Sequence, residues 1–314
     1  MKIVIVGYGE MFQSLISGVL NTKHEVVGVF RHEQVLYNPI KRFFHDAFKP
    51  SNDFNFVRSL GLHDIKATSF NSEEFRKQIK KLKADIILVA SWSERFETET
   101  LNLCKCVNVH PSLLPKFRGP NPYLQAILQG EIITGITFHL MDVGYDSGPI
   151  LYQTSVNILP EDTGYSLKLK CCDTAKKVVT NSLDFILARM EKPISQEEKL
   201  ATYYSHIKLK DIILEFEKET SIEIDKKIRA FYPWYKCVIP YKNQFFEFEN
   251  YEIIYEQSNR EIAEIVKKTK DSLCIVCADK KIIKFEKLKI KQPFSKFLTK
   301  FFMKKIIKIG TKAV

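Results

Sequence analysis

The chain has 314 residues, 45% of them hydrophobic and 27% charged, which is the composition of a globular protein with one large or two medium domains. No apolar run reaches the roughly 18 residues that a membrane span needs. The apolar start of the chain, Met1–Gly7, is too short for a secretory signal peptide. We therefore expect a cytoplasmic protein with no stable membrane association.

The net charge of +11 lies almost entirely at the carboxyl end of the chain. Residues 281–314 hold eleven lysines and one glutamate, so the first 280 residues are nearly neutral. Such a basic segment favours a polyanionic partner, for example a nucleic acid, or an anionic surface.

The seven cysteines do not form a metal-binding pattern. Cys274 and Cys277 have the spacing of half a zinc site, but no second pair and no spaced histidine pair completes it. Because these two cysteines lie within an apolar run, we interpret them as buried free thiols and expect no metal.

The first 31 residues predict the start of an α/β domain. Lys2–Val6 and Glu25–Arg31 are apolar, β-branched runs, and the stretch between them has a helical period as far as Leu20. This order predicts a doubly wound, mainly parallel, Rossmann-like sheet. Gly7-Tyr8-Gly9 invites a dinucleotide interpretation, but Phe12 stands where the third glycine of that fingerprint would be, so NAD binding is not expected.

Residues 31–50 form an irregular basic and aromatic insertion. A surface loop or a short amphipathic helix with solvated charges explains it as well as a binding role does. Helices are expected from Asp53 to Leu60 and, after a Ser-x-Glu cap, from Ser72 to Leu82. Ala84–Ala90 is a continuous apolar run, typical of a buried parallel strand.

Two polar residues share one face of the predicted strand Cys106–His110. Asn108 and His110 are two residues apart, so their side chains project from the same side. Pro111 breaks the strand directly after them, and open α/β sheets bind their ligands at such carboxyl ends.

A third polar residue follows the next strand. A helix capped at Asn121-Pro122 ends at Gly130 and leads to the buried strand Thr134–Met141, on which we interpret His139 as structural. The turn Asp142–Gly148 then offers two carboxylates, one of them Asp146. The sequence thus delivers asparagine, histidine and aspartate to strand ends and loops that could converge.

The pattern changes in the last third of the chain. A strand, Pro149–Ile158, and a helix, Gly164–Met190, complete the first domain, and residues 191–206 are a polar linker. A helix is expected at Ile222–Phe231. After it, short runs at regular spacing predict a small β-barrel: Val238–Tyr241, Phe245–Phe248, Tyr251–Tyr255, Glu261–Val266, Cys274–Ala278 and Ile282–Leu288.

The basic tail has helical spacing of its apolar residues, from Phe294 to Ile307, with lysines elsewhere on the wheel. A basic amphipathic helix can pack on the barrel or lie on an anionic membrane, and we favour packing. The predicted domains are therefore 1–190, a linker 191–206, and 207–314 with the tail.

The trio Asn108, His110 and Asp146 suits acyl transfer to an amine. Attack on a carbonyl builds negative charge on oxygen, which an amide N–H₂ and a protonated imidazole can stabilise, at on the order of 10²–10³ in rate per donor. A carboxylate bonded to the histidine would fix its tautomer, raise its pKa and help to remove the amine proton. Each residue alone could be structural; their combination favours the chemistry.

The segment Asn108-Val-His110-Pro-Ser-Leu-Leu-Pro115-Lys-Phe-Arg-Gly119, with Gly144-Tyr-Asp146-Ser-Gly148, resembles the signature of the folate-dependent formyltransferases. In that family the aspartate lies 36 residues after the histidine, as Asp146 does after His110. Length, segment order and the run Arg229–Trp234 make the whole chain most similar to the branch that formylates methionyl-tRNA.

The resemblance implies 10-formyltetrahydrofolate as the formyl donor, charged initiator tRNA as the acceptor, and a C-terminal barrel of the oligonucleotide-binding sort. It implies that Asn108, His110 and Asp146 are catalytic. The residues expected near the folate are Ser91, Trp92, Ser112, Leu113, Leu114, Pro115 and Asp142. Those expected near nucleic acid are Lys41, Arg42, Lys296, Lys300 and Lys304.

Two alternatives stay open at this point. The insertion 31–50 lacks the glycine-rich pattern that the tRNA enzymes carry in this region, so the acceptor could instead be an amino sugar on a nucleotide. A nucleic-acid-binding protein with a relict catalytic domain is a further possibility, against which the complete Asn108, His110 and Asp146 set argues.

Overall fold

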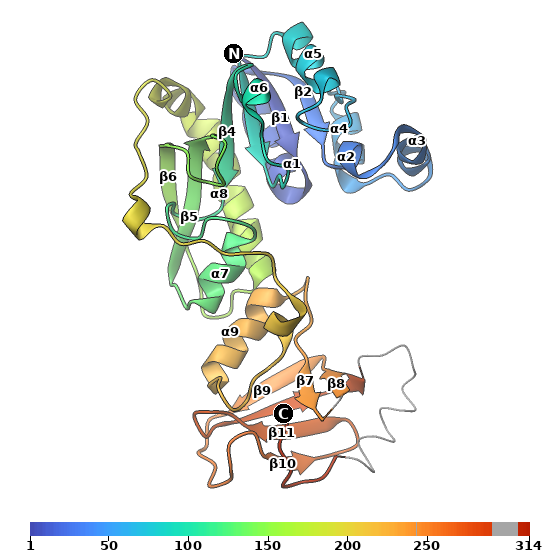
Figure 1. The fold of residues 1–314 in the computed structure, drawn as a ribbon, viewed down its shortest axis with the longest axis vertical. Coiled ribbons are helices and arrows are strands. Elements are labelled where there is room, and N and C mark those ends of the chain that lie inside the picture. Colours follow the sequence, from blue (N-terminus) through green and yellow to red (C-terminus); the bar gives the residue numbers. More distant parts are fainter. Residues whose placement is uncertain (243, 291–306) are drawn as a thin grey trace. The chain divides into compact units, whose positions relative to one another are not determined.

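The structure, a computed structural model, describes the chain except residues 243 and 291–306 (Figure 1). The chain forms two compact units. The first contains Met1–Ala126, Glu131–Leu159 and Ser166–His206, and the second contains Ile127–Gly130, Pro160–Tyr165 and Ile207–Val314.

The first unit is built on a six-stranded sheet in the order β2-β1-β3-β4-β5-β6 (Figure 1). The first four of these strands are parallel, and β5 and β6 continue the sheet antiparallel beside β4. The predicted doubly wound, mainly parallel sheet is therefore confirmed. Its strands are β1 (Lys2–Gly7), β2 (Glu25–Arg31), β3 (Ile86–Ala90), β4 (Lys105–His110), β5 (Ile133–Leu140) and β6 (Ile150–Asn157).

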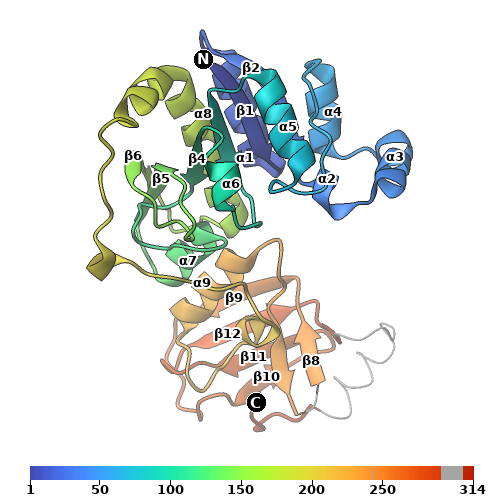
Figure 2. The ribbon, with the colours of Figure 1, turned by 45° about the horizontal axis from the view of Figure 1, so that its top comes forward.

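Helices cover both faces of this sheet (Figure 2). Helix α1 (Gly9–Leu20) contacts α8 (Gly164–Arg189), whose Thr180 hydroxyl donates to the Gly18 carbonyl at 3.4 Å. Helix α5 (Glu73–Leu82) lies on the other face, where its Phe75 packs into the same core as β1 and β3. Because both faces are covered, β3 is buried along its whole length, which explains its continuous apolar sequence.

The insertion at residues 31–50 is helical rather than irregular, so of its two structural interpretations the short helix is confirmed and the surface loop is not. Two short helices, α2 (Glu33–Leu36) and α3 (Pro39–Phe48), precede α4 (Asn52–Ser59). The Asn38 side chain accepts a hydrogen bond from the Lys41 N–H at 2.8 Å and so caps the amino end of α3. Pro39, the first residue of this helix, has a backbone φ that is already restricted to the helical range. The remaining short helices of this unit are α6 (Thr98–Leu101), α7 (Pro122–Leu128) and the 3₁₀ turn Glu198–Leu200.

The second unit contains antiparallel strands, as predicted from the short apolar runs. Its described strands form a four-stranded sheet, β10-β11-β12-β9, and a three-stranded sheet, β13-β8-β7. Phe248 directly follows β8 of the three-stranded sheet, and it contacts Phe285 of β12 in the four-stranded sheet, with ring centroids 4.8 Å apart. The elements are the 3₁₀ turn Leu209–Ile212, α9 (Ser221–Phe231), β7 (Ile239–Tyr241), β8 (Gln244–Glu247), β9 (Asn250–Ile254), β10 (Ile265–Lys268), β11 (Ser272–Val276), β12 (Ile282–Glu286) and β13 (Lys289–Ile290).

Two predictions from the sequence of this unit can be compared with the structure. β10 begins at Ile265, four residues later than predicted, because Ala263 has a φ of +64° and interrupts the extended backbone. Cys274 and Cys277 are buried free thiols, as the apolar run indicated.

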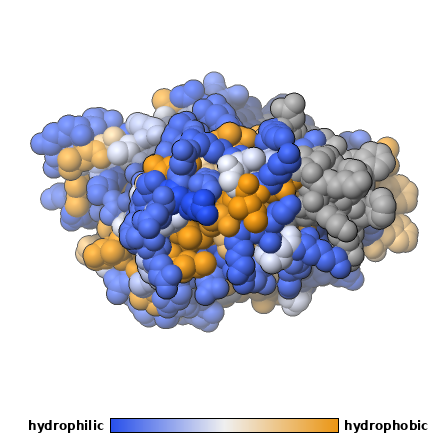
Figure 3. All heavy atoms as spheres, turned by 90° about the horizontal axis from the view of Figure 1, so that it is seen from below, coloured by the Kyte–Doolittle hydropathy of each residue, from blue (hydrophilic) through white to orange (hydrophobic). Residues whose placement is uncertain are grey.

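The end of the chain packs on the second unit. The Ile265 N–H donates to the Thr311 carbonyl at 2.9 Å, the Ala313 N–H donates to the Ala263 carbonyl at 2.9 Å, and Ile307 is buried. On the face seen in Figure 3, hydrophilic residues prevail and hydrophobic ones form small groups between them. The predicted tail helix, with Lys296, Lys300 and Lys304, lies outside the described residues. Among the helices that the structure describes, none combines the length and the apolarity that a membrane crossing requires.

Candidate active site

Four polar side chains occupy one face of the paired strands β4 and β5. In the antiparallel register Asn108 lies opposite His139, and His110 lies opposite Thr137. Because side chains alternate along a strand, all four point to the same side of the sheet. His139 therefore shares the face that carries Asn108 and His110, at a spacing of two from Thr137, and its interpretation as a structural residue stays a prediction.

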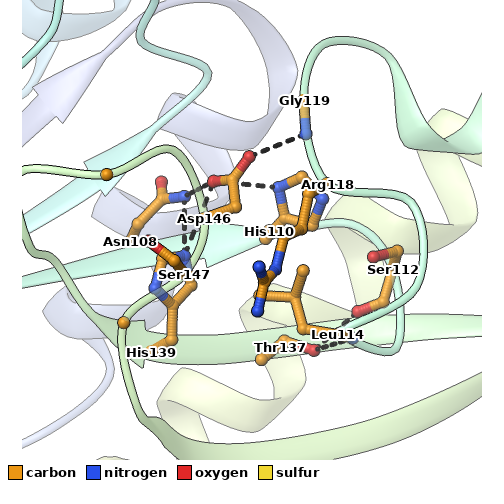
Figure 4. Close-up of polar contacts among 12 residues, drawn as sticks. Asn108, His110, Ser112, Leu114, Arg118, Gly119, Thr137, His139, Asp146 and Ser147 are labelled. Carbon is orange, nitrogen blue, oxygen red and sulfur yellow. Dashed lines mark hydrogen bonds and ion pairs between the residues drawn. The ribbon is translucent and has the colours of Figure 1, made fainter. Parts of the chain in front are cut away.

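Asp146 joins this face from the loop between β5 and β6 (Figure 4). Its Oδ1 lies 3.2 Å from the Asn108 amide nitrogen and 3.4 Å from His110 Nδ1. Its Oδ2 accepts from the Gly119 N–H at 2.9 Å. The structure thus brings Asn108, His110 and Asp146 together at a single carboxylate.

His110 faces a hydrogen-bond acceptor on each side of its ring. Nε2 lies 2.8 Å from the Phe117 carbonyl oxygen, and Nδ1 faces Asp146. Burial lowers the pKa of His110 by more than the Asp146 charge and the Phe117 carbonyl raise it. The carboxylate therefore raises the pKa as expected, but burial, which the sequence did not show, outweighs it. A neutral imidazole donates to only one of these acceptors, so the second acceptor can stabilise a proton that arrives during a reaction.

Asp146 is a carboxylate at neutral pH. Burial alone would raise its pKa, but the nearby His110 and His139 and the hydrogen bond from Gly119 outweigh burial and lower the pKa well below its usual range. A permanent negative charge therefore lies beside His110.

The Asn108 amide nitrogen is already engaged. It donates to Asp146 Oδ1 at 3.2 Å and lies 3.1 Å from His139 Nε2. His139 Nδ1 lies 2.9 Å from the Leu140 carbonyl, so the proton on Nδ1 leaves Nε2 as the acceptor for Asn108. In this state Asn108 holds Asp146 and His139, so stabilising an oxyanion requires the amide to release one of these contacts.

The loop predicted to contact folate, Ser112–Pro115, is tied to β5 by Thr137. The Thr137 hydroxyl donates to the Ser112 carbonyl at 2.6 Å and accepts from the Leu114 N–H at 3.1 Å. The Ser112 hydroxyl is buried and donates to the Lys116 carbonyl at 2.7 Å. Ser112 therefore shapes the loop, while Leu113 and Pro115 are partly exposed.

The other predicted folate residues lie on two loops that are joined by Arg95. Arg95 donates from Nε to the Val143 carbonyl at 2.7 Å, which links the loop carrying Ser91 and Trp92 to the loop carrying Asp142. Asp142 accepts from the Gly144 N–H at 2.9 Å and from Ser147, so it stabilises its own turn.

Trp92 is packed among aromatic rings. Its ring lies 5.4 Å from Phe30 and 5.2 Å from His32, measured between centroids. Its buried Nε1–H has no hydrogen-bond partner in the described part of the chain. An unpaired buried donor costs free energy, so this indole N–H is an unsatisfied polar group inside the aromatic cluster.

The two described residues that are predicted to contact nucleic acid differ in their exposure to solvent. Lys41 is exposed, with its amino group 5.0 Å from the centroid of the Tyr37 ring. Arg42 is partly buried and donates to the Gln34 carbonyl at 3.2 Å. Of these two described residues, Lys41 is therefore the more exposed. Within the described residues, no group of three or more His, Cys, Asp or Glu side chains is arranged to hold a metal ion.

Comparison with known proteins identifies the family. Residues 1–183 match the formyl transferase family, and residues 206–301 match the formyl transferase C-terminal domain. The methionyl-tRNA formyltransferase of Kosmotoga olearia is 32% identical over 243 residues, which cover 74% of this chain and 74% of that protein. The methionyl-tRNA formyltransferase of Buchnera aphidicola subsp. Acyrthosiphon pisum is 27% identical and covers 99% of this chain, which covers 98% of that protein.

A solved structure shares the fold. WlaRD, a sugar 3N-formyl transferase crystallised with dTDP and 5-N-formyl-THF, has a TM-score of 0.65 and 20% identity, and the match covers 91% of this chain and 97% of that one. With both domain matches and 32% identity over most of its length, the chain belongs to the family of folate-dependent formyltransferases and is an enzyme.

Proposed function

We propose that this enzyme moves a formyl group from 10-formyltetrahydrofolate to the amino group of methionyl-tRNA charged for translation initiation. The observation that carries the proposal is the alignment with a methionyl-tRNA formyltransferase along 99% of the chain, through both domains. The convergence of Asn108, His110 and Asp146 supports the formyl-transfer step.

The donor fits the loops around the candidate trio. Ser91 and Trp92 on one loop and Asp142 on another would border the folate ring. The Ser112–Pro115 loop would form the wall nearest His110, because Thr137 fixes it to the same strand face. When bound, the folate supplies the formyl carbon that the amine attacks.

In this proposal each residue of the trio has its own role in the formyl transfer. Neutral His110 accepts the proton that the attacking amine loses and returns it to the folate nitrogen as the bond between that nitrogen and the formyl carbon breaks; between these steps the Asp146 carboxylate and the Phe117 carbonyl stabilise the imidazolium. That imidazolium and the Asn108 amide stabilise the negative charge that develops on the formyl oxygen, once Asn108 turns from Asp146 or His139. Asp146 keeps its charge throughout.

The acceptor is supported by charge. Residues 281–314 carry +10 of the net charge of +11, which suits a polyanion such as tRNA. In this proposal residues 1–190 carry the chemistry, residues 191–206 link the domains, and residues 207–314 hold tRNA. Lys41, Arg42 and the tail lysines Lys296, Lys300 and Lys304 would contribute phosphate contacts.

An amino sugar on a nucleotide is the second candidate acceptor. It is favoured by the structural likeness to WlaRD at a TM-score of 0.65. The insertion, which forms helix α3 in place of a glycine-rich loop, also departs from the pattern of the tRNA enzymes.

One experiment separates the acceptors. The purified enzyme is incubated with 10-formyltetrahydrofolate and either charged initiator tRNA or a set of dTDP-linked amino sugars, and the formylated amine is identified by mass spectrometry. We expect formyl-methionine on the tRNA. Turnover of an amino sugar, with none of the tRNA, would reject the proposed acceptor while retaining the donor.

A further inference from the structure

The segment after α8 returns to the candidate active site. We call residues 194–204 the strap. At its start, Ile194 exchanges two backbone hydrogen bonds with Ile150 of β6, at 2.7 and 2.8 Å. Further along, the Thr202 carbonyl accepts from the Arg118 N–H at 2.8 Å and the Tyr204 N–H donates to the Arg118 carbonyl at 3.0 Å. The strap thus runs beside the loop whose backbone contacts His110 and Asp146.

Gln196 joins the two loops of the site through one amide. Its Nε2 donates to the carbonyl oxygens of Asp146 and Gly148, at 2.8 and 2.7 Å. Its Oε1 accepts from Nε and Nη2 of Arg118, at 3.1 and 2.8 Å. All four hydrogen-bonding positions of the amide are occupied, so its orientation is determined.

Arg118 is the other half of the connection. Its buried guanidinium makes a bidentate pair with Glu198, at 3.0 and 2.7 Å, and also donates to the Tyr203 hydroxyl. Together with Gln196, these contacts use all five N–H donors of the side chain. Arg118 lies between Phe117 and Gly119, the two residues whose backbone groups bind His110 and Asp146.

Both loops have backbone conformations that need support. Phe117 has a φ of +62°, Gly119 of +99° and Asp146 of +54°. Non-glycine residues in this region cost on the order of 1 kcal/mol or more each and persist only where the surroundings fix them. The strap holds the carbonyl of Asp146 and both backbone groups of Arg118, which are the parts of these loops that would move on relaxation.

We infer that the strap is a positioning element of the active site, and that Gln196 is its central residue, holding Asp146 and the Phe117–Gly119 loop against His110. The inference deepens the proposed function, on which its catalytic meaning rests. Gln196 does not reach the reacting atoms; it acts through Asp146 and Arg118.

Three substitutions separate the parts of this connection. Gln196→Met removes all four hydrogen bonds. Gln196→Glu keeps the acceptors for Arg118 but turns a carboxylate oxygen toward the Asp146 and Gly148 carbonyls. Glu198→Gln weakens only the Arg118 end. Glu197→Gln is the matched control, because Glu197 is the neighbouring exposed carboxylate and pairs, within the described part of the chain, with Lys199 at 3.2 Å.

Activity gives the first readout. We expect both Gln196 variants to lower kcat roughly tenfold with little change in KM for the folate, because a displaced catalytic group costs rate rather than binding. Glu198→Gln should have a smaller effect and Glu197→Gln none. In an Asp146→Asn background, Gln196→Met should cost clearly less than tenfold, because the part of its effect that passes through Asp146 is already lost. Additive losses would mean that Gln196 acts elsewhere.

The titration of His110 gives a second readout that needs no substrate. The groups that face His110 are Asp146 from the β5–β6 loop, His139 from β5 and Arg118 from the loop after β4. If the strap loosens, the distances from His110 to the Asp146 charge and to the Phe117 carbonyl change, and so does the shielding of its ring from water, so its pKa changes. We expect the ¹⁵N-histidine NMR titration of Gln196→Met to shift by roughly 0.5 unit or more.

The two readouts keep the inference and the proposed function apart. An unchanged His110 titration in a folded Gln196→Met protein overturns the role of the strap. A shifted titration with parental kcat retains the strap but rejects His110 as the catalytic base. If the parent formylates neither acceptor, the proposed function fails, and the titration still decides the strap.

Discussion

Two arginines of the first unit are fully buried, yet they are held in opposite ways. Arg118 places all five guanidinium N–H groups on Gln196, Glu198 and Tyr203. Arg31 donates from Nη2 to Asp64 at 2.8 Å and to Asp46 at 3.3 Å. Its Nε and Nη1 have no hydrogen-bond partner among the residues that the structure describes.

The difference shows which region must hold a fixed geometry. The loop around Arg118 presents the Phe117 carbonyl to His110 and the Gly119 N–H to Asp146, so a shift there alters the site directly. The Arg31 cluster joins β2 to the α2–α3 insertion and contacts none of the trio. A polar cluster with unpaired buried atoms contributes little net stability, so the insertion is held more weakly than the site.

The largest expected difference between the two regions is in rate. His110→Ala and Asp146→Asn should each lower kcat by roughly 10² or more, because both groups handle the transferred proton and developing charge. Asp64→Asn, the matched change beside Arg31, should leave kcat within a few-fold. Steady-state formylation assays compare the three. The comparison fails if Asp64→Asn is as damaging as Asp146→Asn.

The two losses should not add. Asp146 acts through the proton on His110, so the double variant should be about as slow as the slower single variant. A double variant that is slower by the product of both factors would show that the two residues work independently.

Stability should separate the arginines next. Arg118→Met removes five hydrogen bonds, to Gln196, Glu198 and Tyr203, and should lower the free energy of unfolding by roughly 2–4 kcal/mol. Arg31→Met should cost about 1 kcal/mol or less. In this variant Asp64 keeps its hydrogen bonds from the Lys66 amino group, at 2.6 Å, and from the Gln34 amide, at 3.0 Å. The substitution also removes Nε and Nη1 of Arg31, two buried donors without a hydrogen-bond partner among the described residues. Urea unfolding measures both, and equal losses would contradict the ranking.

The sequence predicted what depends on local pattern. The apolar runs at Lys2–Val6 and Ala84–Ala90 predicted buried parallel strands because both faces of the sheet are covered. The spacing of Asn108 and His110 predicted one shared face, and the structure adds Asp146 to it. These inferences needed only the period of a strand and the position of a turn.

The sequence could not predict what depends on distant pairing. Gln196 lies 50 residues from Asp146, in a stretch whose polar composition is that of a linker, and nothing local indicates that its amide fits between two loops. The lowered pKa of His110 was missed for a related reason. The carboxylate is visible in the sequence, whereas the burial that outweighs it comes from packing.

The pH dependence of stability sharpens the comparison further. The folded state lowers the pKa of His110, so the unfolded chain binds a proton first as the pH falls through about 6.5, and stability falls with it. His110→Gln should flatten this slope, by at most about 1.4 kcal/mol per pH unit. Urea unfolding from pH 7.5 to 5.5 provides the measurement, and an unchanged slope would mean that His110 does not titrate on unfolding.

Asp64→Asn is the control from the Arg31 region. Burial alone would raise the pKa of Asp64, but Arg31 and Lys66 outweigh it and lower that pKa. Its contribution to stability is therefore present above its usual value of 3.8 and is lost only as the pH falls below it. Asp64→Asn should leave the slope between pH 7.5 and 5.5 unchanged and flatten the curve at the acid end.

The smallest effect is expected on the insertion, where a weakly held segment is better suited to binding than to chemistry. Lys41 is exposed, so Lys41→Ala should leave folding and kcat near the parent and raise KM for tRNA only a few-fold. If Lys41 neutralises one phosphate, the slope of log affinity against log salt should fall by about 0.7–0.9. Lys77→Ala is the control, because Lys77 is an exposed lysine that pairs with Glu73 on α5. Filter binding across a salt series measures both variants. An identical slope in Lys41→Ala and the parent would remove the insertion from the tRNA contact, and a KM change with an amino-sugar nucleotide would assign it to the other acceptor.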